Sequence, residues 1–212
     1  MAAKTPKPTV VFLVRHGTTG TTGKVLPGRA AGLHLSDTGR AQADKAAERL
    51  ARVTGIGAVY ASPLERTRET AAPIARALGL RPRRRKGLLE CDFGSWTGRK
   101  LSDLMKKPEW RTVQSTPSEF RFPGGESFME MQTRIVAELQ LLASRHAGEA
   151  IVAVSHADPI KAAVAHFAGT HLDLFQRTVV SPCSISAVLL GGTPIVLTVN
   201  STGDDLSGLG PS

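Results

Sequence analysis

Two histidines follow directly on apolar runs that have the character of β-strands. Residues 10–14 lead into Arg15 and His16, and residues 150–154 lead through a serine into His156. In an open α/β sheet, ligands bind just beyond the carboxyl ends of the strands, so neighbouring strands would bring both histidines to one pocket. Because Arg15 carries a permanent positive charge, the sequence predicts a site for an anion there.

The residue types expected around this pocket suit the transfer of a phosphoryl group. A phosphomonoester repels nucleophiles through its own charge, so a catalyst must neutralise the phosphoryl oxygens and supply a nucleophile and a proton for the leaving alcohol. Arg15 and Arg66 are suited to clamp the oxygens. The neutral imidazole of His16 is a competent nucleophile near pH 7. His156 would add a positive charge or a hydrogen bond, and Glu90 could protonate the leaving oxygen and then activate water.

Strand-like and helix-like segments alternate along the chain and predict an α/β fold with helices covering a sheet. The strand-like runs are residues 10–14, 58–61, 83–89, 150–154, 184–190 and 195–199, and the helical periodicity covers residues 40–53, 63–78, 127–146 and 159–167. Ser62 and Glu65 are expected to cap the second helix, which places Arg66 in its first turn. The last two strands predict a hairpin at the sheet edge, which a second subunit could cover to form a homodimer.

Length and composition favour one domain. The 212 residues are 41% hydrophobic, which suits a single core over residues 9–200. Residues 1–8 and 201–212 are expected to be flexible tails. The irregular, proline-punctuated stretch at residues 100–125 resembles an insertion or lid whose tip contacts substrate.

The net charge of +9 favours anionic partners. The densest basic run, residues 81–86, has little aromatic interleaving and matches no nucleic-acid module, which favours a solvated or substrate-steering patch over nucleic-acid binding. No secretory signal or membrane-spanning run is present. Cys91 and Cys183 form neither a disulfide framework nor a metal cluster. We therefore expect a cytoplasmic protein that does not bind membranes.

At these residues the chain resembles the histidine phosphatase superfamily, the phosphoglycerate-mutase-like group. The segments that carry the resemblance are residues 13–19 (LVRHGTT), 35–43 (LSDTGRAQA), 62–71 (SPLERTRETA), 88–98 (LLECDFGSWTG), 122–127 (FPGGES) and 154–157 (VSHA). The resemblance covers residues 9–200 and implies a three-layer α/β/α sandwich with a mostly parallel central sheet. It also implies a phosphorylated His16, phosphate binding by Arg15 and Arg66, a proton donor at Glu90 and a second catalytic histidine at His156. No metal or other cofactor is implied, and the partner is a small phosphorylated metabolite.

Departures from the family pattern favour the phosphatase branch. Thr22 stands where an asparagine commonly contacts phosphate, and Ala157 replaces a glycine after the second histidine, a change that spares a backbone N–H contact. Phe93 replaces the tyrosine that mutases carry after the donor glutamate, and residues 100–125 lack the paired arginines of the mutase insertion. Substrate specificity is expected to depend on that segment and on Arg29.

Three functions follow from the sequence. The leading hypothesis is metal-independent hydrolysis of a phosphomonoester, of acid or broad-specificity type, through a phosphohistidine on His16. The nearest alternative is a phosphoglycerate-type phosphomutase, which returns the phosphoryl group to a bound acceptor. A non-catalytic protein that binds anions or nucleic acid is the third, and the net charge is its only support.

Overall fold

Six strands form one sheet in the computed structural model, which describes residues 7–211. The strands are β1 (Thr9–Arg15), β2 (Ile56–Ala61), β3 (Arg83–Arg84), β4 (Ala150–Ser155), β5 (Ile185–Leu190) and β6 (Ile195–Ser201). Their order across the sheet is β3-β2-β4-β1-β5-β6. The first four are mutually parallel, and the β5–β6 hairpin continues the sheet in antiparallel fashion. The predicted mostly parallel sheet with an edge hairpin is confirmed.

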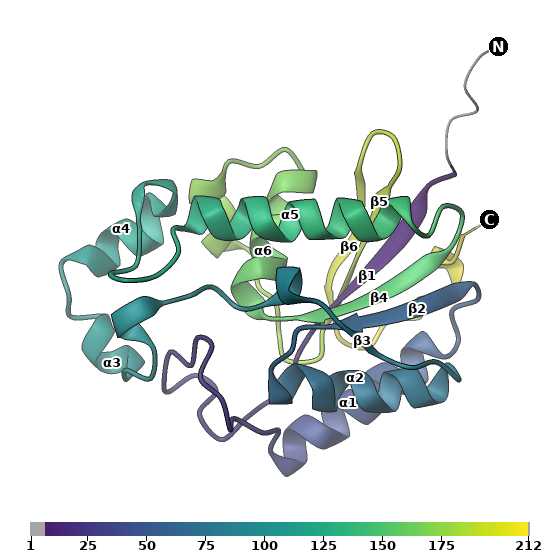
Figure 1. The fold of residues 1–212 in the computed structure, drawn as a ribbon, viewed down its shortest axis with the longest axis horizontal. Helices are drawn as coiled ribbons and strands as arrows, with labels where there is room; N and C mark the ends of the chain where they lie inside the picture. Colours follow the sequence, from purple (N-terminus) through teal and green to yellow (C-terminus); the bar gives the residue numbers. More distant parts are fainter. Residues whose placement is uncertain (1–6, 212) are drawn as a thin grey trace.

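Helices cover both faces of this sheet (Figure 1). Helices α1 (Asp37–Leu50) and α2 (Glu65–Ala77) lie on one face, and α5 (Phe128–Ser144) and α6 (Ala157–Phe167) lie on the other. Because both faces are covered, successive side chains of β1 enter different cores: Phe12 packs with the α1 and α2 side, and Leu13 packs with the α5 and α6 side. This double burial explains the continuous apolar runs of the parallel strands and confirms the three-layer sandwich.

The two strands that precede the histidines are direct neighbours. Arg15 at the end of β1 pairs in register with Ser155 at the end of β4. The backbone N–H of His16 donates to the Ser155 carbonyl at 3.0 Å. Since the strands are parallel and end at the same level, His16 and His156 emerge together at one edge of the sheet, as the sequence predicts.

Residues 100–125 contain two short α-helices, α3 (Leu101–Leu104) and α4 (Glu109–Ser115). They rest on a separate aromatic core in which Phe122 contacts four other rings, with centroids 4.8 Å away for Phe93, 5.5 Å for Trp96, 4.9 Å for Phe120 and 5.2 Å for Phe128. The segment is therefore anchored to the domain through its aromatic side chains.

The third strand, predicted over residues 83–89, is much shorter in the structure. Only Arg83 and Arg84 pair with β2, and Lys86–Leu88 form a 3-10 turn. The Arg85 side chain instead binds Glu138 of α5 at 2.5 Å. A Cβ at Gly87 would lie 2.3 Å from the same carboxylate. Docking onto α5 thus replaces strand pairing and turns the chain toward Glu90.

Part of the stretch from residue 201 to residue 211 is packed against the domain, whereas its polar composition predicts a flexible tail over residues 201–212. Ser201 ends β6, and Leu206 is buried against the core between the sheet and α1. Arg49 of α1 donates to the Ser201 carbonyl at 3.0 Å and to the Asp204 carbonyl at 3.0 Å. These contacts are long-range, so local composition does not reveal them. Residues 1–6 of the expected amino-terminal tail lie outside the described residues.

Candidate active site

His16 is held as a neutral imidazole with one free nitrogen. Its Nδ1 lies 2.8 Å from the Gly17 carbonyl, which can only accept, so Nδ1 carries the ring proton. Burial, assisted by the nearby charge of Arg66, lowers the pKa of His16 to about 3. Nε2 therefore carries a free lone pair, and a neutral imidazole in this tautomer can attack an electrophile through Nε2.

Two arginines bring unpaired hydrogen-bond donors to the same place. Arg66 is fully buried in the first turn of α2; its Nη2 donates to the Gly28 carbonyl at 2.7 Å, while Nε and Nη1 have no partner. Arg15 donates from Nη1 to the Val180 carbonyl at 2.7 Å and leaves its Nε unpaired. Burial lowers the pKa of both guanidinium groups. Burying a cationic donor without a hydrogen-bond partner costs folding free energy. Two such side chains at one place are suited to bind an anion.

His156 adds a fourth unpaired nitrogen. It is fully buried, its ring centroid lies 5.2 Å from that of His16, and its Nε2 is 2.9 Å from the Ser62 hydroxyl. Its Nδ1 has no hydrogen-bond partner. Burial and then the charge of Arg66 lower the pKa of His156 well below its usual value. The second histidine is thus a neutral side chain with one nitrogen available to a ligand.

Glu90 completes the cluster from the loop that follows the 3-10 turn. Its Oε2 lies 4.0 Å from His156 Nδ1, and its Oε1 accepts the Cys91 N–H at 3.0 Å. Burial, followed by the negative charge of Asp158, raises the pKa of Glu90 to about 7. A carboxyl group with this pKa can hold a proton near neutral pH and also release it, which suits acid and base catalysis.

The unpaired donors form a coherent set. Among the described residues, four of the six buried side-chain nitrogen and oxygen atoms without partners belong to Arg15, Arg66 and His156. Buried polar groups in folded proteins are nearly always satisfied, so such a cluster demands an explanation. Donors converging beside the free Nε2 of His16 can hold the oxygens of a tetrahedral anion against that nitrogen.

Helix α6 begins directly after His156, at Ala157 rather than at residue 159 as expected. The first N–H groups of a helix have no intrahelical partner and favour negative charge. Ala157 supplies the first of them, which is consistent with the backbone contact expected at this position.

Two predicted substrate contacts are engaged elsewhere. The Thr22 hydroxyl accepts the Thr19 N–H at 2.9 Å and lies 3.0 Å from the Thr19 hydroxyl, so it closes its own loop. Arg29 donates from Nε to the Glu90 carbonyl at 2.9 Å and contacts Glu126 at 2.8 Å. Arg29 therefore binds the backbone of the Glu90 loop.

Three further residues belong to this region although sequence reasoning gave them no role in it. Ser62 was expected to cap α2, but the cap is Leu64, without a side-chain hydrogen bond, and the Ser62 hydroxyl faces His156 instead. Asp158 lies in the first turn of α6. Glu126 lies in the segment at residues 122–127. The recurrence of this segment in the family was the only sign in the sequence that Glu126 has a role near the site.

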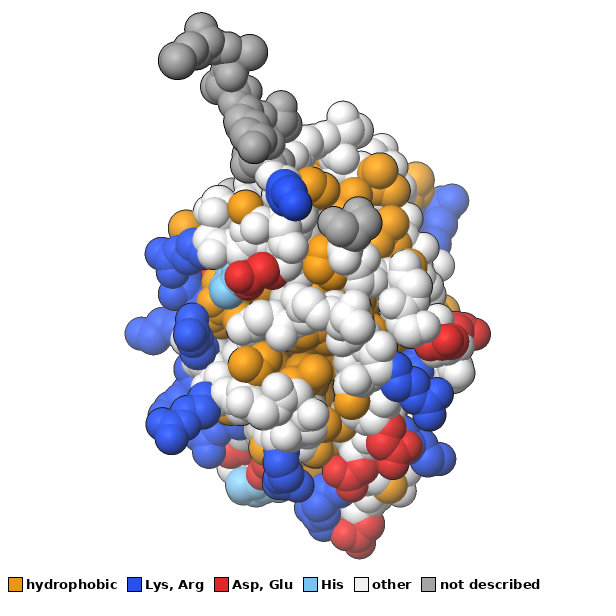
Figure 2. Space-filling model, turned by 90° about the vertical axis from the view of Figure 1, so that its right-hand side faces the viewer, with side chains coloured by type: hydrophobic (Ala, Val, Ile, Leu, Met, Phe, Trp, Pro, Cys, Tyr) orange, Lys and Arg blue, Asp and Glu red, His pale blue; other side chains and the backbone are white. Residues whose placement is uncertain are grey.

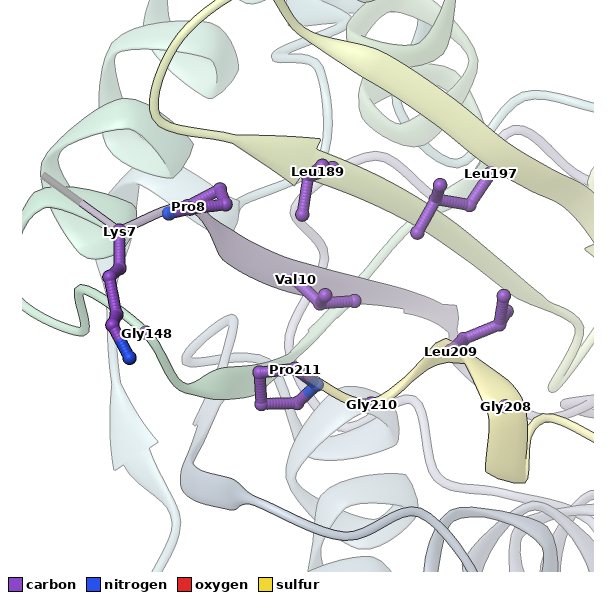
Figure 3. A pocket seen from close by; sticks show the side chains of 10 residues that line it. All are labelled: Lys7, Pro8, Val10, Gly148, Leu189, Leu197, Gly208, Leu209, Gly210 and Pro211. Atoms are coloured by element: carbon purple, nitrogen blue, oxygen red, sulfur yellow. The ribbon is translucent and has the colours of Figure 1, made fainter. Parts of the chain in front are cut away.

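The described residues place other features away from this cluster. A cavity lined mostly by apolar side chains lies near the amino end of β1, between Val10, Leu189, Leu197 and Leu209 (Figure 3). The face beside the chain ends carries a central band of apolar side chains with basic side chains at its margins (Figure 2). Within residues 7–211 no group of three or more His, Cys, Asp or Glu side chains is arranged to hold a metal. No helix in the same range is long and apolar enough to cross a membrane.

Comparison with known proteins agrees with this geometry. Residues 11–202 match the histidine phosphatase superfamily, branch 1. Phosphoserine phosphatase 1 of Hydrogenobacter thermophilus is 35% identical over 143 residues, which cover 66% of this chain and 67% of that protein. A bifunctional protein of Mycobacterium tuberculosis is 34% identical over 211 residues, covering 92% of this chain and 55% of that longer protein.

Solved structures share the fold. A mycobacterial glucosyl-3-phosphoglycerate phosphatase superposes with a TM-score of 0.82 at 22% identity, over 92% of this chain and 100% of that one. At this identity the likeness establishes the architecture, while the family match spans nearly the whole sheet and all the residues of the cluster. The chain belongs to branch 1 of the histidine phosphatase superfamily.

Proposed function

We propose that this protein hydrolyses phosphomonoesters through a phosphohistidine formed on His16. The observation that carries the proposal is the set of four unpaired, buried nitrogens on Arg15, Arg66 and His156 beside an imidazole whose Nε2 is free. These groups match the charge and the oxygen geometry of a phosphoryl group. Membership of a family that contains phosphatases supports the same conclusion.

In the first half of the reaction, His16 Nε2 attacks phosphorus and the bond from phosphorus to the ester oxygen breaks. Arg15, Arg66 and the Nδ1–H of His156 stabilise the charge on the phosphoryl oxygens. Glu90 transfers its proton to the leaving oxygen, so the alcohol departs neutral. The Ser62 hydroxyl lies 2.9 Å from His156 Nε2; by donating to it in the reaction, the hydroxyl keeps the proton of this histidine on Nδ1, where it faces the phosphoryl group.

In the second half, the Glu90 carboxylate takes a proton from a water molecule that attacks phosphorus. The bond between His16 Nε2 and phosphorus breaks, and inorganic phosphate is released. Glu90 is again protonated and His16 is again neutral, so the enzyme returns to its starting state. A pKa of about 7 for Glu90 allows both roles at neutral pH.

The substrate is a small phosphorylated metabolite. The name of the Hydrogenobacter relative indicates phosphoserine, and that of the mycobacterial structure indicates glucosyl-3-phosphoglycerate. Phe93 in place of the mutase tyrosine and the lack of paired arginines at residues 100–125 favour hydrolysis over transfer to an acceptor. Cytoplasmic localisation is supported by the two free cysteines, Cys91 and Cys183.

Two surface features complete the proposal. On the edge strand β6, Ile195 and Val199 are 51% and 37% exposed, which supports pairing of two copies along this edge in a homodimer. In the basic run at residues 81–86, Arg85 is paired with Glu138, whereas Arg83 and Arg84 are exposed. The exposed pair serves to attract anionic metabolites, and nucleic acid is not required as a partner.

Hydrolysis of p-nitrophenyl phosphate by the wild type and by His16→Ala tests the proposal. We expect activity that persists with a chelator, because Arg15 and Arg66 supply the positive charge, and that disappears in the variant. Full activity in His16→Ala would refute the phosphohistidine. Release of phosphorylated acceptor in place of inorganic phosphate would favour a mutase. Salt-sensitive RNA binding by a catalytically silent wild type would favour the non-catalytic alternative.

A further inference from the structure

Glu126 lies outside the catalytic cluster, yet it connects the two arginines that bind the backbone of Glu90. We propose that Glu126 is a positioning residue that acts through Arg29 and Arg134 to hold Glu90 in place for proton transfer. The inference rests on the proposed role of Glu90 and assigns a purpose to the segment at residues 122–127.

The Glu90 carbonyl is bound from two sides. Arg29 Nε donates to it at 2.9 Å, and Arg134 Nη2 of α5 donates to it at 3.3 Å. Both guanidinium groups then meet on Glu126: Arg29 Nη2 lies 2.8 Å from Oε1, and Arg134 reaches Oε1 and Oε2 at 2.9 Å each. One carboxylate therefore fixes the orientation of both arginines.

Glu126 also binds the chain on the far side of Glu90. The Asp92 N–H donates to Glu126 Oε2 at 3.1 Å, and the Glu126 N–H donates to the Asp92 carbonyl at 2.9 Å. Arg134 Nη1 donates to the carbonyls of Gly87 and Leu89 at 2.9 Å each. The backbone from residue 87 to residue 92 is thus held by a single charged network.

This backbone determines where the catalytic carboxyl group lies. Glu90 accepts the N–H of its neighbour Cys91 on Oε1, so the side chain follows its own backbone, and Oε2 is left to face His156 at 4.0 Å. Proton transfer needs a donor within hydrogen-bond reach of the leaving oxygen, and small displacements reduce its rate strongly. Loosening the backbone would therefore impair proton transfer before it impaired phosphate binding.

Glu126 has an electrostatic effect as well. Burial acts to raise the pKa of Glu126, but the hydrogen bonds and charge of Arg134 outweigh it and keep the pKa lowered, so the carboxylate is ionised. Its negative charge offsets the two arginines beside Glu90. The other charged or titratable groups around Glu90 are the thiol of the adjacent Cys91, Arg15 from β1, Arg66 from α2, and His156 and Asp158 at the start of α6. Loss of the Glu126 charge leaves net positive charge there and favours the ionised form of Glu90.

The dependence of kcat/KM on the leaving group separates positioning from a general structural role. This parameter reports steps up to loss of the alcohol, and p-nitrophenolate leaves without needing a proton, whereas an alkoxide does not. For Glu126→Gln we expect kcat/KM for an alkyl phosphate such as glycerol phosphate to fall about tenfold to a hundredfold, as for partial loss of general acid catalysis. The value for p-nitrophenyl phosphate should change less than about threefold.

Glu138→Gln is the matched control. It breaks a different ion pair between α5 and the same stretch of chain, the one with Arg85, and leaves the contacts of Glu126 intact. It should not change the ratio between the two substrates. A basic limb of the pH profile that moves to lower pH in Glu126→Gln, with rescue of the alkyl substrate by Glu126→Asp, would support positioning.

An equal fall on both substrates, or no fall on the alkyl phosphate, would overturn the inference while leaving the phosphatase assignment intact. A wild type inactive on both substrates would overturn the proposed function and the inference together. If Glu126→Gln does not fold, as judged by circular dichroism, the substrate ratio is measured on Arg29→Lys, which keeps the charge but removes the Nε–H bond to the Glu90 carbonyl; a ratio equal to that of the wild type and of Glu138→Gln would overturn positioning.

Discussion

Replacing Arg66 by methionine should make the protein more stable while removing its activity. Arg66 is fully buried, with two unpaired guanidinium nitrogens and a single hydrogen bond, to the Gly28 carbonyl. Each unsatisfied buried donor costs about 1 to 3 kcal/mol, whereas a hydrogen bond from a charged group contributes about 1.5 to 3 kcal/mol. Removing two orphaned donors, worth about 2 to 6 kcal/mol together, and losing one bond of about 1.5 to 3 kcal/mol gives a central net gain in unfolding free energy of about 2 kcal/mol.

The assay is urea unfolding at neutral pH, without phosphate, with the free energy extrapolated to water. Melting should agree, at about 2 to 4 °C per kcal/mol for a chain of this size. Arg85→Met is the matched control, because it removes an arginine paired with Glu138 and should destabilise the protein. Inorganic phosphate should stabilise the wild type and not Arg66→Met, because only the wild type retains the anion site.

Destabilisation of Arg66→Met by more than that of Arg85→Met would refute the reasoning. The guanidinium would then be a structural element, and its unpaired nitrogens would not represent a site prepared for an anion. Increased stability with full activity would separate Arg66 from catalysis and would also contradict the account.

Three further predictions concern the same site. Ser62→Ala removes the hydroxyl 2.9 Å from His156 Nε2, and kcat/KM should fall by about tenfold, the loss of roughly one hydrogen bond; an unchanged value would show that Ser62 does not orient His156. Because Glu90 must be protonated to act as the acid and its pKa is about 7, kcat/KM for an alkyl phosphate should fall as pH rises through that value, and Glu90→Gln should lack this limb; a wild-type profile flat to pH 9, well above about 7, would contradict the role. Gly39→Ala places a Cβ 2.1 Å from the Thr18 carbonyl and should destabilise the protein by about 1 to 3 kcal/mol, whereas Gly20→Ala, whose Cβ meets no atom within 4 Å, should be nearly neutral in the same unfolding assay.

The parallel sheet and the meeting of His16 with His156 could be predicted because strands buried on both faces leave continuous apolar runs. The polar residue that follows such a run must lie at the strand end, so two runs suffice to place two histidines. Helix α5 was equally readable from the helical periodicity of residues 127–146, and the structure adds a capping box between Ser127 and Glu130.

The rest depends on contacts between residues far apart in the chain. Ser62 carries a convincing capping pattern, yet its hydroxyl pairs with a histidine 94 residues later. Likewise, the sequence assigns Arg29 to substrate specificity, and only the fold shows its contact with Glu126. Residues 201–211 read as a polar tail because the sequence does not show that Arg49 binds their carbonyls. Local sequence patterns predict which secondary structure or cap a segment can form by itself. Contacts between side chains distant in the sequence determine which of these it forms in the folded protein.

The central claim is that a phosphoryl group passes through His16. The most direct measurement is rapid quenching of the enzyme with a radiolabelled phosphomonoester, followed by peptide mapping of the protein-bound label. The account predicts an acid-labile, alkali-stable label on the peptide that contains His16, formed and lost fast enough to support turnover and absent from His16→Ala. Turnover by the wild type with no label on this peptide, or with label on another residue, would contradict it.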